Sequence, residues 1–88
     1  MSSDDNWDVR VARNVTKALR KFPKKDLDAI EAAVVGMRRD PYFGDIQKLG
    51  GQNAWRRRTG SYRISYEVHQ EVRLVIVFEV RRRTSTTY

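Results

Sequence analysis

The chain has 88 residues, no cysteine and one histidine, and its formal net charge is +7. This length predicts a single domain over residues 1–88, and the composition excludes disulfides, thiolate metal sites and any site that needs two histidine ligands. We therefore expect neither a metal nor a small-molecule cofactor. No apolar run approaches the roughly 20 residues of a membrane span, and the acidic start of the chain is unlike a secretory signal. A cytoplasmic protein without a membrane partner is expected.

The positive charge is distributed unevenly along the chain. Residues 1–45 have nine Lys/Arg and eight Asp/Glu, whereas residues 46–88 have nine and three. This balance places the excess charge in the second half and predicts a face that binds a polyanion, for which nucleic acid is the commonest candidate. The alternative is a solvated basic surface that has no partner.

The first half predicts one strand and two helices. Trp7, Val9 and Val11 alternate with polar residues, which indicates a strand over residues 6–12. Apolar residues at helical spacing then predict a helix over about 13–21 and a second over about 24–39. Pro23 separates the two helices, and Pro41 ends the second, because the residue before a proline avoids the helical conformation.

The second half predicts three strands in close succession, over residues 53–59, 62–69 and 72–81. Gly60 and Ser61 suit a tight turn between the first two. The middle strand alternates cleanly, and the last is apolar at nearly every position, as expected of a central strand. The predicted fold is α+β with the order β-α-α-β-β-β. A helical hairpin packs on one face of a mainly antiparallel four-stranded sheet, and the first strand is added at an edge.

Strand periodicity places several arginines on one face of this sheet. Arg56 and Arg58 share a face, and Arg63 projects opposite to the apolar residues of the middle strand. The tight turn brings Arg58 and Arg63 close together. Arg81, Arg82 and Arg83 alternate between the two faces, so one or two of them join the same group, with Tyr88 within short reach.

Such a cluster suits phosphate chemistry. Guanidinium groups match phosphate geometry and stabilise the charge that develops when a phosphodiester is cleaved. Tyr88, or Tyr42 and Phe43, can stack on an unpaired base. No acidic cluster is expected near the arginines, which argues against a nuclease that depends on Mg²⁺. The alternative for the arginines is a solvated sheet face.

The order of elements and several segments resemble the RelE/ParE superfamily of bacterial toxins. The resemblance covers residues 7–88 and depends on the DP pair after the second helix, the KLGG segment over 48–51, WRRRTGSYRISY over 55–66, and an apolar strand that ends in RRR and a tyrosine. Members of the RelE branch cut messenger RNA in the ribosomal A site, where the 2′-hydroxyl attacks the neighbouring phosphate. They are inhibited by a cognate antitoxin protein.

The resemblance implies roles for particular residues. Arg56 and Arg58 would contact phosphate or assist proton transfer, Arg63 would stabilise the pentavalent phosphate, Arg83 or Arg82 would act at the leaving oxygen, and Tyr88 would orient the nucleotide. A wider set would bind RNA: Lys48, Arg57, Arg81 and Arg82. The implied partners are the ribosome, messenger RNA and an antitoxin.

The general base stays open at the level of sequence. The RelE pattern has lysines on the strand that here carries Arg56 and Arg58, and arginine is a poor base because it stays protonated. Lys48, Glu67, His69 and a bound water are the alternatives. Two other functions also stay open: a DNA gyrase inhibitor like the ParE branch, and a catalytically weak relative that binds RNA or an antitoxin.

Overall fold

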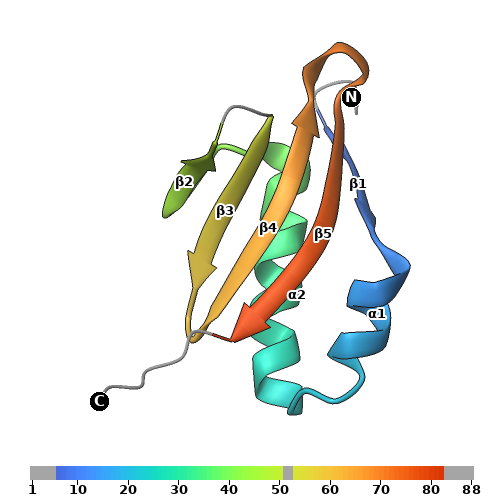
Figure 1. The fold of residues 1–88 in the computed structure, drawn as a ribbon, viewed down its shortest axis with the longest axis vertical. Helices are drawn as coiled ribbons and strands as arrows, with labels where there is room; N and C mark the ends of the chain where they lie inside the picture. The colour runs from blue at the N-terminus through green and yellow to red at the C-terminus, as the bar shows by residue number, and fades with distance from the viewer. Residues whose placement is uncertain (1–5, 51–52, 83–88) are drawn as a thin grey trace.

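The computed structural model describes residues 6–50 and 53–82, and in this part of the chain two α-helices and five strands form one α+β fold (Figure 1). The chain begins with β1 (Asp8–Val11), α1 (Arg13–Leu19) and α2 (Lys24–Arg39). It continues with β2 (Ile46–Leu49), β3 (Ala54–Thr59), β4 (Tyr62–His69) and β5 (Leu74–Arg82). The predicted fold class is confirmed.

The five described strands form one sheet in the order β1-β5-β4-β3-β2. β1 pairs in parallel with β5, and every other neighbouring pair is antiparallel. The first strand therefore lies at an edge, as predicted. α2 crosses behind the sheet in Figure 1, so the opposite face is left open toward the viewer. We refer to that uncovered side of the sheet as the open face.

The prediction of four strands was wrong by one. Residues 46–49 form β2, which pairs with β3 from Ile46 opposite Arg57 to Leu49 opposite Ala54. The sequence IQKL shows neither a clean alternation nor an apolar run, so its local pattern does not predict a strand. Its strand conformation comes from pairing with β3 rather than from a local preference, as is common for short edge strands.

The core lies between α2 and the helix-facing side of the sheet. The alternating residues Tyr62, Ile64, Tyr66 and Val68 of β4 are all buried, as their period of two predicted. α2 packs its own buried residues against them: Ile30, Ala33 and Met37. α1 adds Val15 to the same core. This packing fixes which side of β4 is covered, and therefore which side carries Arg63.

A β-bulge changes the facing of β5 halfway along the strand. Tyr66 is opposite Val77 but Ser65 is opposite Glu79, so Phe78 is the extra residue. Before the bulge, Val75 and Val77 are buried in the core. Beyond it the alternation is offset by one residue, and Arg81 comes to lie opposite Arg63 on the open face.

Two tyrosine hydroxyls tie β4 to the helical layer. Tyr62 Oη donates to Asp26 Oδ2 of α2 at 2.7 Å, and Tyr66 Oη donates to the carbonyl of Pro41. The hydrogen bond to Asp26, followed by burial, raises the pKa of Tyr62. Burial raises the pKa of Tyr66 to about 12. No helix within residues 6–50 or 53–82 has the length and apolar character to cross a membrane.

The buried Tyr66 predicts a loss of stability at alkaline pH. A tyrosine in the unfolded chain has a pKa of about 10, so the raised folded-state value stabilises the protein below pH about 10 and ceases to do so as the pH approaches 12. We expect the free energy of unfolding to fall across this window, by up to about 2–3 kcal/mol from this residue. Urea unfolding at a series of pH values measures the change.

The matched variant is Tyr66→Phe, which cannot ionise. At neutral pH it should be less stable by about 1 kcal/mol, because the hydrogen bond to Pro41 is lost. Its stability should fall less steeply with alkaline pH than that of the wild type. An equally steep fall in both proteins would contradict the assignment.

Candidate nucleic-acid site on the open face

The turn between β3 and β4 brings the arginines together. Thr59 and Tyr62 are paired, so Gly60 and Ser61 form a two-residue hairpin loop. Gly60 has a φ of 57°, a left-handed conformation that favours glycine. Because the loop is this short, Arg58 is directly opposite Arg63 in the register. The predicted hairpin and this proximity are confirmed.

Three arginines form a continuous row across the open face. Arg58 of β3 is paired with Arg63 of β4, and Arg63 is paired with Arg81 of β5. Directly opposite residues on neighbouring strands have Cβ atoms about 5 Å apart, and like charges there repel. We call Arg58, Arg63 and Arg81 the arginine row. Arg56 lies two residues before Arg58 on the same face of β3, opposite Ser65.

Two carboxylates flank the arginine row, one at each end. Asp45 Oδ2 accepts a hydrogen bond from Arg58 Nε at 3.1 Å, and Glu79 Oε2 lies 3.4 Å from Arg81 Nε. Among the residues that the structure describes, Arg56 and Arg63 have no carboxylate within ion-pair distance. The guanidinium groups of Arg56 and Arg63 are therefore the ones whose positive charge is left available to an anion.

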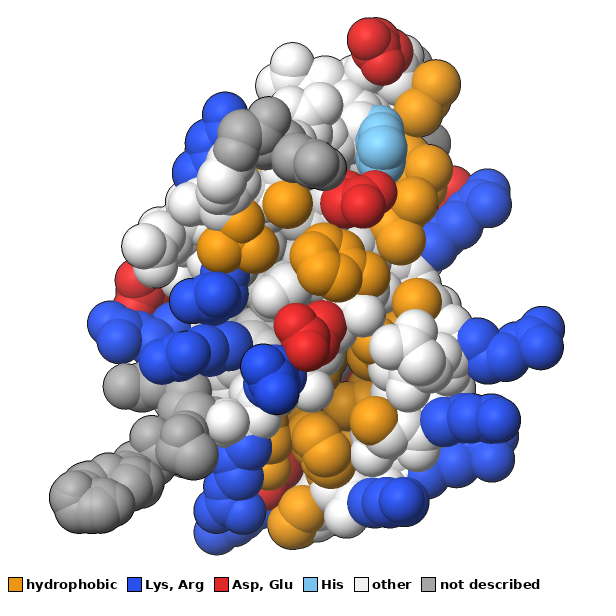
Figure 2. Space-filling view, in the orientation of Figure 1, with side chains coloured by type: hydrophobic (Ala, Val, Ile, Leu, Met, Phe, Trp, Pro, Cys, Tyr) orange, Lys and Arg blue, Asp and Glu red, His pale blue; other side chains and the backbone are white. Residues whose placement is uncertain are grey.

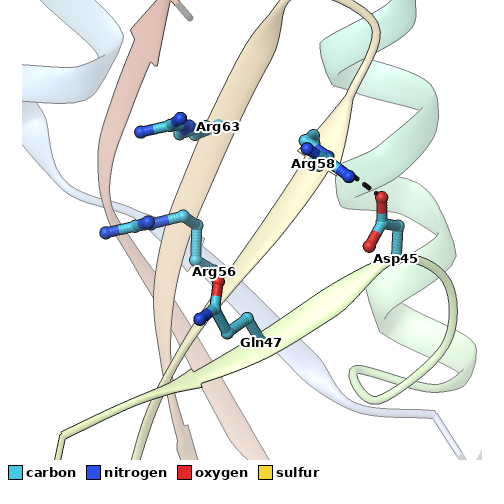
Figure 3. A pocket seen from close by; sticks show the side chains of 5 residues that line it. All are labelled: Asp45, Gln47, Arg56, Arg58 and Arg63. Carbon is cyan, nitrogen blue, oxygen red and sulfur yellow. Dashed lines mark hydrogen bonds and ion pairs between the residues drawn. The ribbon is translucent and has the colours of Figure 1, made fainter.

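A shallow pocket of about 140 Å³ opens on this cluster. Its walls are Asp45, Gln47, Arg56, Arg58 and Arg63 (Figure 3). Arg56 and Arg63 extend in the same direction in this view, whereas Arg58 turns toward Asp45. We call this the arginine pocket. Its size and charge suit a single phosphate group rather than a whole small-molecule substrate.

The structure separates some predicted residues from the pocket. Lys48 is paired with Trp55, and its Nζ lies 5.9 Å from the centre of the Trp55 ring on the helix-facing side. Arg57 also points to that side, where its guanidinium lies 5.9 Å from the Phe43 ring. Arg82 is opposite the buried Tyr62. None of these three contributes to the arginine pocket, so their assignment to RNA binding stays a prediction.

The aromatic residues of the loop after α2 do not reach the pocket either. Tyr42 packs edge-on against Trp55 with ring centroids 5.4 Å apart, and its hydroxyl accepts a hydrogen bond from Gln70 Nε2 at 2.9 Å. Phe43 lies over Arg57 on the helix-facing side. Of the predicted stacking residues, Tyr42 and Phe43 therefore do not contribute to the arginine pocket. Arg83 and Tyr88 both lie outside the described residues.

Sequence reasoning missed the acidic side of this site. Asp45 precedes the unpredicted strand β2, and Gln47 lies within it. Pairing of residues 46–49 with β3 would have placed Asp45 and Gln47 beside the arginines. That pairing can be inferred only if residues 46–49 are first recognised as a strand. Glu79 was hidden by the bulge, which reverses the facing of β5. The sequence analysis considered only an acidic cluster, and it did not anticipate the single carboxylates of Asp45 and Glu79 beside Arg58 and Arg81.

A second basic surface was hidden by counting charge over half the chain. Residues 9–25 include seven Lys/Arg and no Asp/Glu, and all seven side chains are exposed. On α1, Arg13 and Lys17 project away from the buried Val15. Figure 2 shows basic side chains along the edge that α1 forms and a separate group over the open face. The excess positive charge is therefore not confined to the second half.

Several solved structures have a fold similar to that of this chain. A chain of the archaeal RelE–RelB complex from Pyrococcus horikoshii OT3 superposes with a TM-score of 0.82 at 23% identity, covering 92% of this chain and 99% of that one. The isolated E. coli RelE toxin gives 0.79 at 17%, covering 91% and 87%. A chain of the RelBE2 toxin–antitoxin complex from Mycobacterium tuberculosis gives 0.78 at 23%, covering 89% and 99%.

These neighbours confirm, at the level of the fold, the resemblance that the sequence indicated, and the matches cover 89–92% of the chain. No protein-family model matches the chain, and no curated protein matches its sequence. At these identities the shared feature is the fold, so the roles of particular residues depend on the geometry of the open face.

The buried guanidinium of Arg57 leads to the prediction that replacing this residue stabilises the protein. Its Nε and Nη1 atoms are buried and have no hydrogen-bond partner among the described residues, and a Cβ at Gly44 would lie only 3.1 Å from its Cζ. Buried unsatisfied polar groups are costly. We expect Arg57→Met to raise the free energy of unfolding by about 1 kcal/mol, as measured by urea unfolding.

The same variant tests whether Arg57 contacts RNA. Because Arg57 faces away from the arginine pocket, Arg57→Met should bind RNA as the wild type does, whereas Arg56→Met on the open face should bind more weakly. A loss of affinity in Arg57→Met that equals the loss in Arg56→Met would show that RNA reaches the helix-facing side.

Proposed function

We propose that this protein is the toxin of a type II toxin–antitoxin module and cleaves messenger RNA on the ribosome without a metal. The observation that carries the proposal is the arginine pocket, in which Arg56 and Arg63 have no carboxylate partner within the described residues and share an open face with Arg58. The RelE fold of the chain supports the same assignment.

The proposed reaction is an attack within the RNA chain. The 2′-oxygen of one nucleotide attacks the adjacent phosphorus, the bond to the 5′-oxygen breaks, and the products carry a 2′,3′-cyclic phosphate and a 5′-hydroxyl. The phosphorane gains negative charge on its equatorial oxygens. Preorganised guanidinium groups stabilise this added charge in the transition state more strongly than they stabilise the phosphodiester in the ground state. Arg63 lies at the centre of the arginine row and is assigned this role, with Arg56 and Arg58 holding the phosphate.

The ribosome supplies what the shallow pocket lacks. A pocket of about 140 Å³ contacts one phosphate and few other groups of the substrate. Cleavage also requires the 2′-oxygen, the phosphorus and the 5′-oxygen to be in line, which means that the RNA must be held from outside the site. A messenger fixed in the A site meets this requirement. The basic surface of α1 adds affinity for a large RNA partner in the cytoplasm.

A cognate antitoxin is proposed as the protein partner. Several structural neighbours were solved as complexes of RelE with RelB, from Pyrococcus horikoshii, E. coli and Methanococcus jannaschii. An antitoxin that covers the open face would bring carboxylates to Arg56 and Arg63 in place of phosphate. The outer arginines of the row, Arg58 and Arg81, already form ion pairs with carboxylates of the chain itself.

Substitution of Arg63 tests the proposed function. In bacteria that express the wild type briefly, primer extension on a translated message should reveal cuts inside codons. Arg63→Ala should reduce these cuts by about 10²–10³-fold, the usual effect of removing one donor to a transition-state oxyanion. Arg38→Ala is the matched control, because Arg38 is exposed in the last turn of α2, on the side of the sheet opposite the open face, and does not line the pocket.

Three results would contradict the proposal. Undiminished cutting by Arg63→Ala would remove the arginine pocket from the reaction. Growth arrest with DNA breaks and intact messages would point to a gyrase inhibitor. Neither arrest nor cuts would leave a binding protein without activity.

A further inference from the structure

Asp45 is the one described carboxylate that lines the arginine pocket. It precedes β2 and is held against β3 by two interactions with the same residue. The backbone N–H of Arg58 donates to the Asp45 carbonyl at 2.9 Å, and Arg58 Nε donates to Asp45 Oδ2 at 3.1 Å. The backbone and the side chain of Asp45 are therefore both fixed relative to Arg58, without help from any substrate.

The second carboxylate oxygen of Asp45 is available for chemistry. Within the described residues Oδ1 accepts no hydrogen bond, and the side chain is 63% exposed. Figure 3 shows this oxygen turned away from Arg58, toward the side of the pocket on which Gln47 lies. One oxygen thus anchors the group, and the other is left without a hydrogen bond in the described chain, at the edge of the pocket that Asp45 lines together with Arg56, Arg58 and Arg63.

The other groups that can accept a proton lie elsewhere. Lys48 is on the helix-facing side of β2, beside Trp55. Glu67 and His69 bond to each other at 2.9 Å, and they lie roughly 13 and 20 Å along β4 from Arg63, at about 3.3 Å per residue. Glu79 bonds to Arg81 and does not line the pocket. The arginines themselves stay protonated.

We propose that Asp45 is the general base that takes the proton from the attacking 2′-hydroxyl. This rests on the proposed function. Oδ1 accepts the proton as the bond between O2′ and phosphorus forms, and Arg56 and Arg63 stabilise the phosphorane. The bond from phosphorus to O5′ then breaks, and O5′ takes a proton from water. Asp45 returns its proton to solvent. The carboxylate supplies the basic group that β3 lacks, because the ionisable side chains of β3 are all arginines.

The test is single-turnover cleavage of a short synthetic message on programmed ribosomes, with messenger affinity measured in parallel. Asp45→Asn keeps the shape and a hydrogen-bond acceptor for Arg58 but accepts no proton. We expect it to slow cleavage by about 10²-fold or more. Its affinity for the message should equal or exceed that of the wild type, because a negative charge near the phosphate is removed. Asp45→Glu should restore part of the rate.

Glu79→Gln is the matched control. It removes the same charge from the opposite end of the arginine row, so its affinity should rise in the same way while its cleavage rate stays near that of the wild type. If Glu79→Gln slowed cleavage as much as Asp45→Asn, the effect would be one of charge, and the assignment of a base would be overturned.

A modified message separates a base from other roles. When sulfur replaces the bridging 5′-oxygen at the cleaved phosphate, the leaving group no longer needs a proton. The defect of Asp45→Asn should persist on this substrate. Rescue by sulfur would place Asp45 at the leaving oxygen instead, and weaker messenger binding, as expected for Arg58→Ala, would show that Asp45 only positions Arg58. Either result would overturn the proposal.

The outcomes also separate this proposal from the function on which it rests. If the wild type cleaves the message and Asp45→Asn cleaves equally fast, the proposed function stands and the base is another group. If the wild type cleaves no message on the ribosome, the proposed function itself fails.

Discussion

Arg58, Arg63 and Arg81 lie directly opposite one another on three adjacent strands, so their like charges repel in the folded chain. Like charges on directly opposite residues of neighbouring strands destabilise a sheet. The sheet tolerates this repulsion because its other face is a well-packed core, in which Tyr66 and Ile64 are fully buried. Stability and charge are thus assigned to opposite faces of the same three strands.

The repulsion also explains where the acidic residues lie. Asp45 and Glu79 each neutralise an outer arginine of the row, which leaves Arg63 between them with its charge uncompensated within the described chain. A central free guanidinium flanked by anchored ones is a preorganised anion site, since little reorientation is needed when phosphate arrives. The bulge at Phe78 belongs to this arrangement, because without its offset Arg81 would face the helices and Arg82 would face the open side.

Much of this architecture was predictable from local patterns. The alternation of residues 62–69 identified the buried face of β4, and Gly60-Ser61 identified the hairpin that pairs Arg58 with Arg63. The parts that escaped prediction depend on pairing between distant residues. β2 has no periodic signal of its own, and its position beside β3 brings Asp45 and Gln47 to the pocket. The bulge on β5 is likewise a property of two paired strands, so the facing of Glu79 could not be inferred from either strand alone.

The three consecutive arginines of β3 lie in different environments, because successive side chains of a strand point to opposite faces of the sheet. Arg56 and Arg58 point to the open face, while Arg57 points into the helical layer, where Gly36 and Gly44 leave room for its guanidinium. A strand that places arginine at each of these positions supplies charge on both sides but no group that readily accepts a proton. Any base must then come from a neighbouring segment, and β2 is the strand that pairs with this one on its free edge. Because the proposed base, Asp45, precedes β2 whereas the arginines lie on β3 and β4, the proposal makes binding of the phosphate and activation of the hydroxyl separable properties of one site.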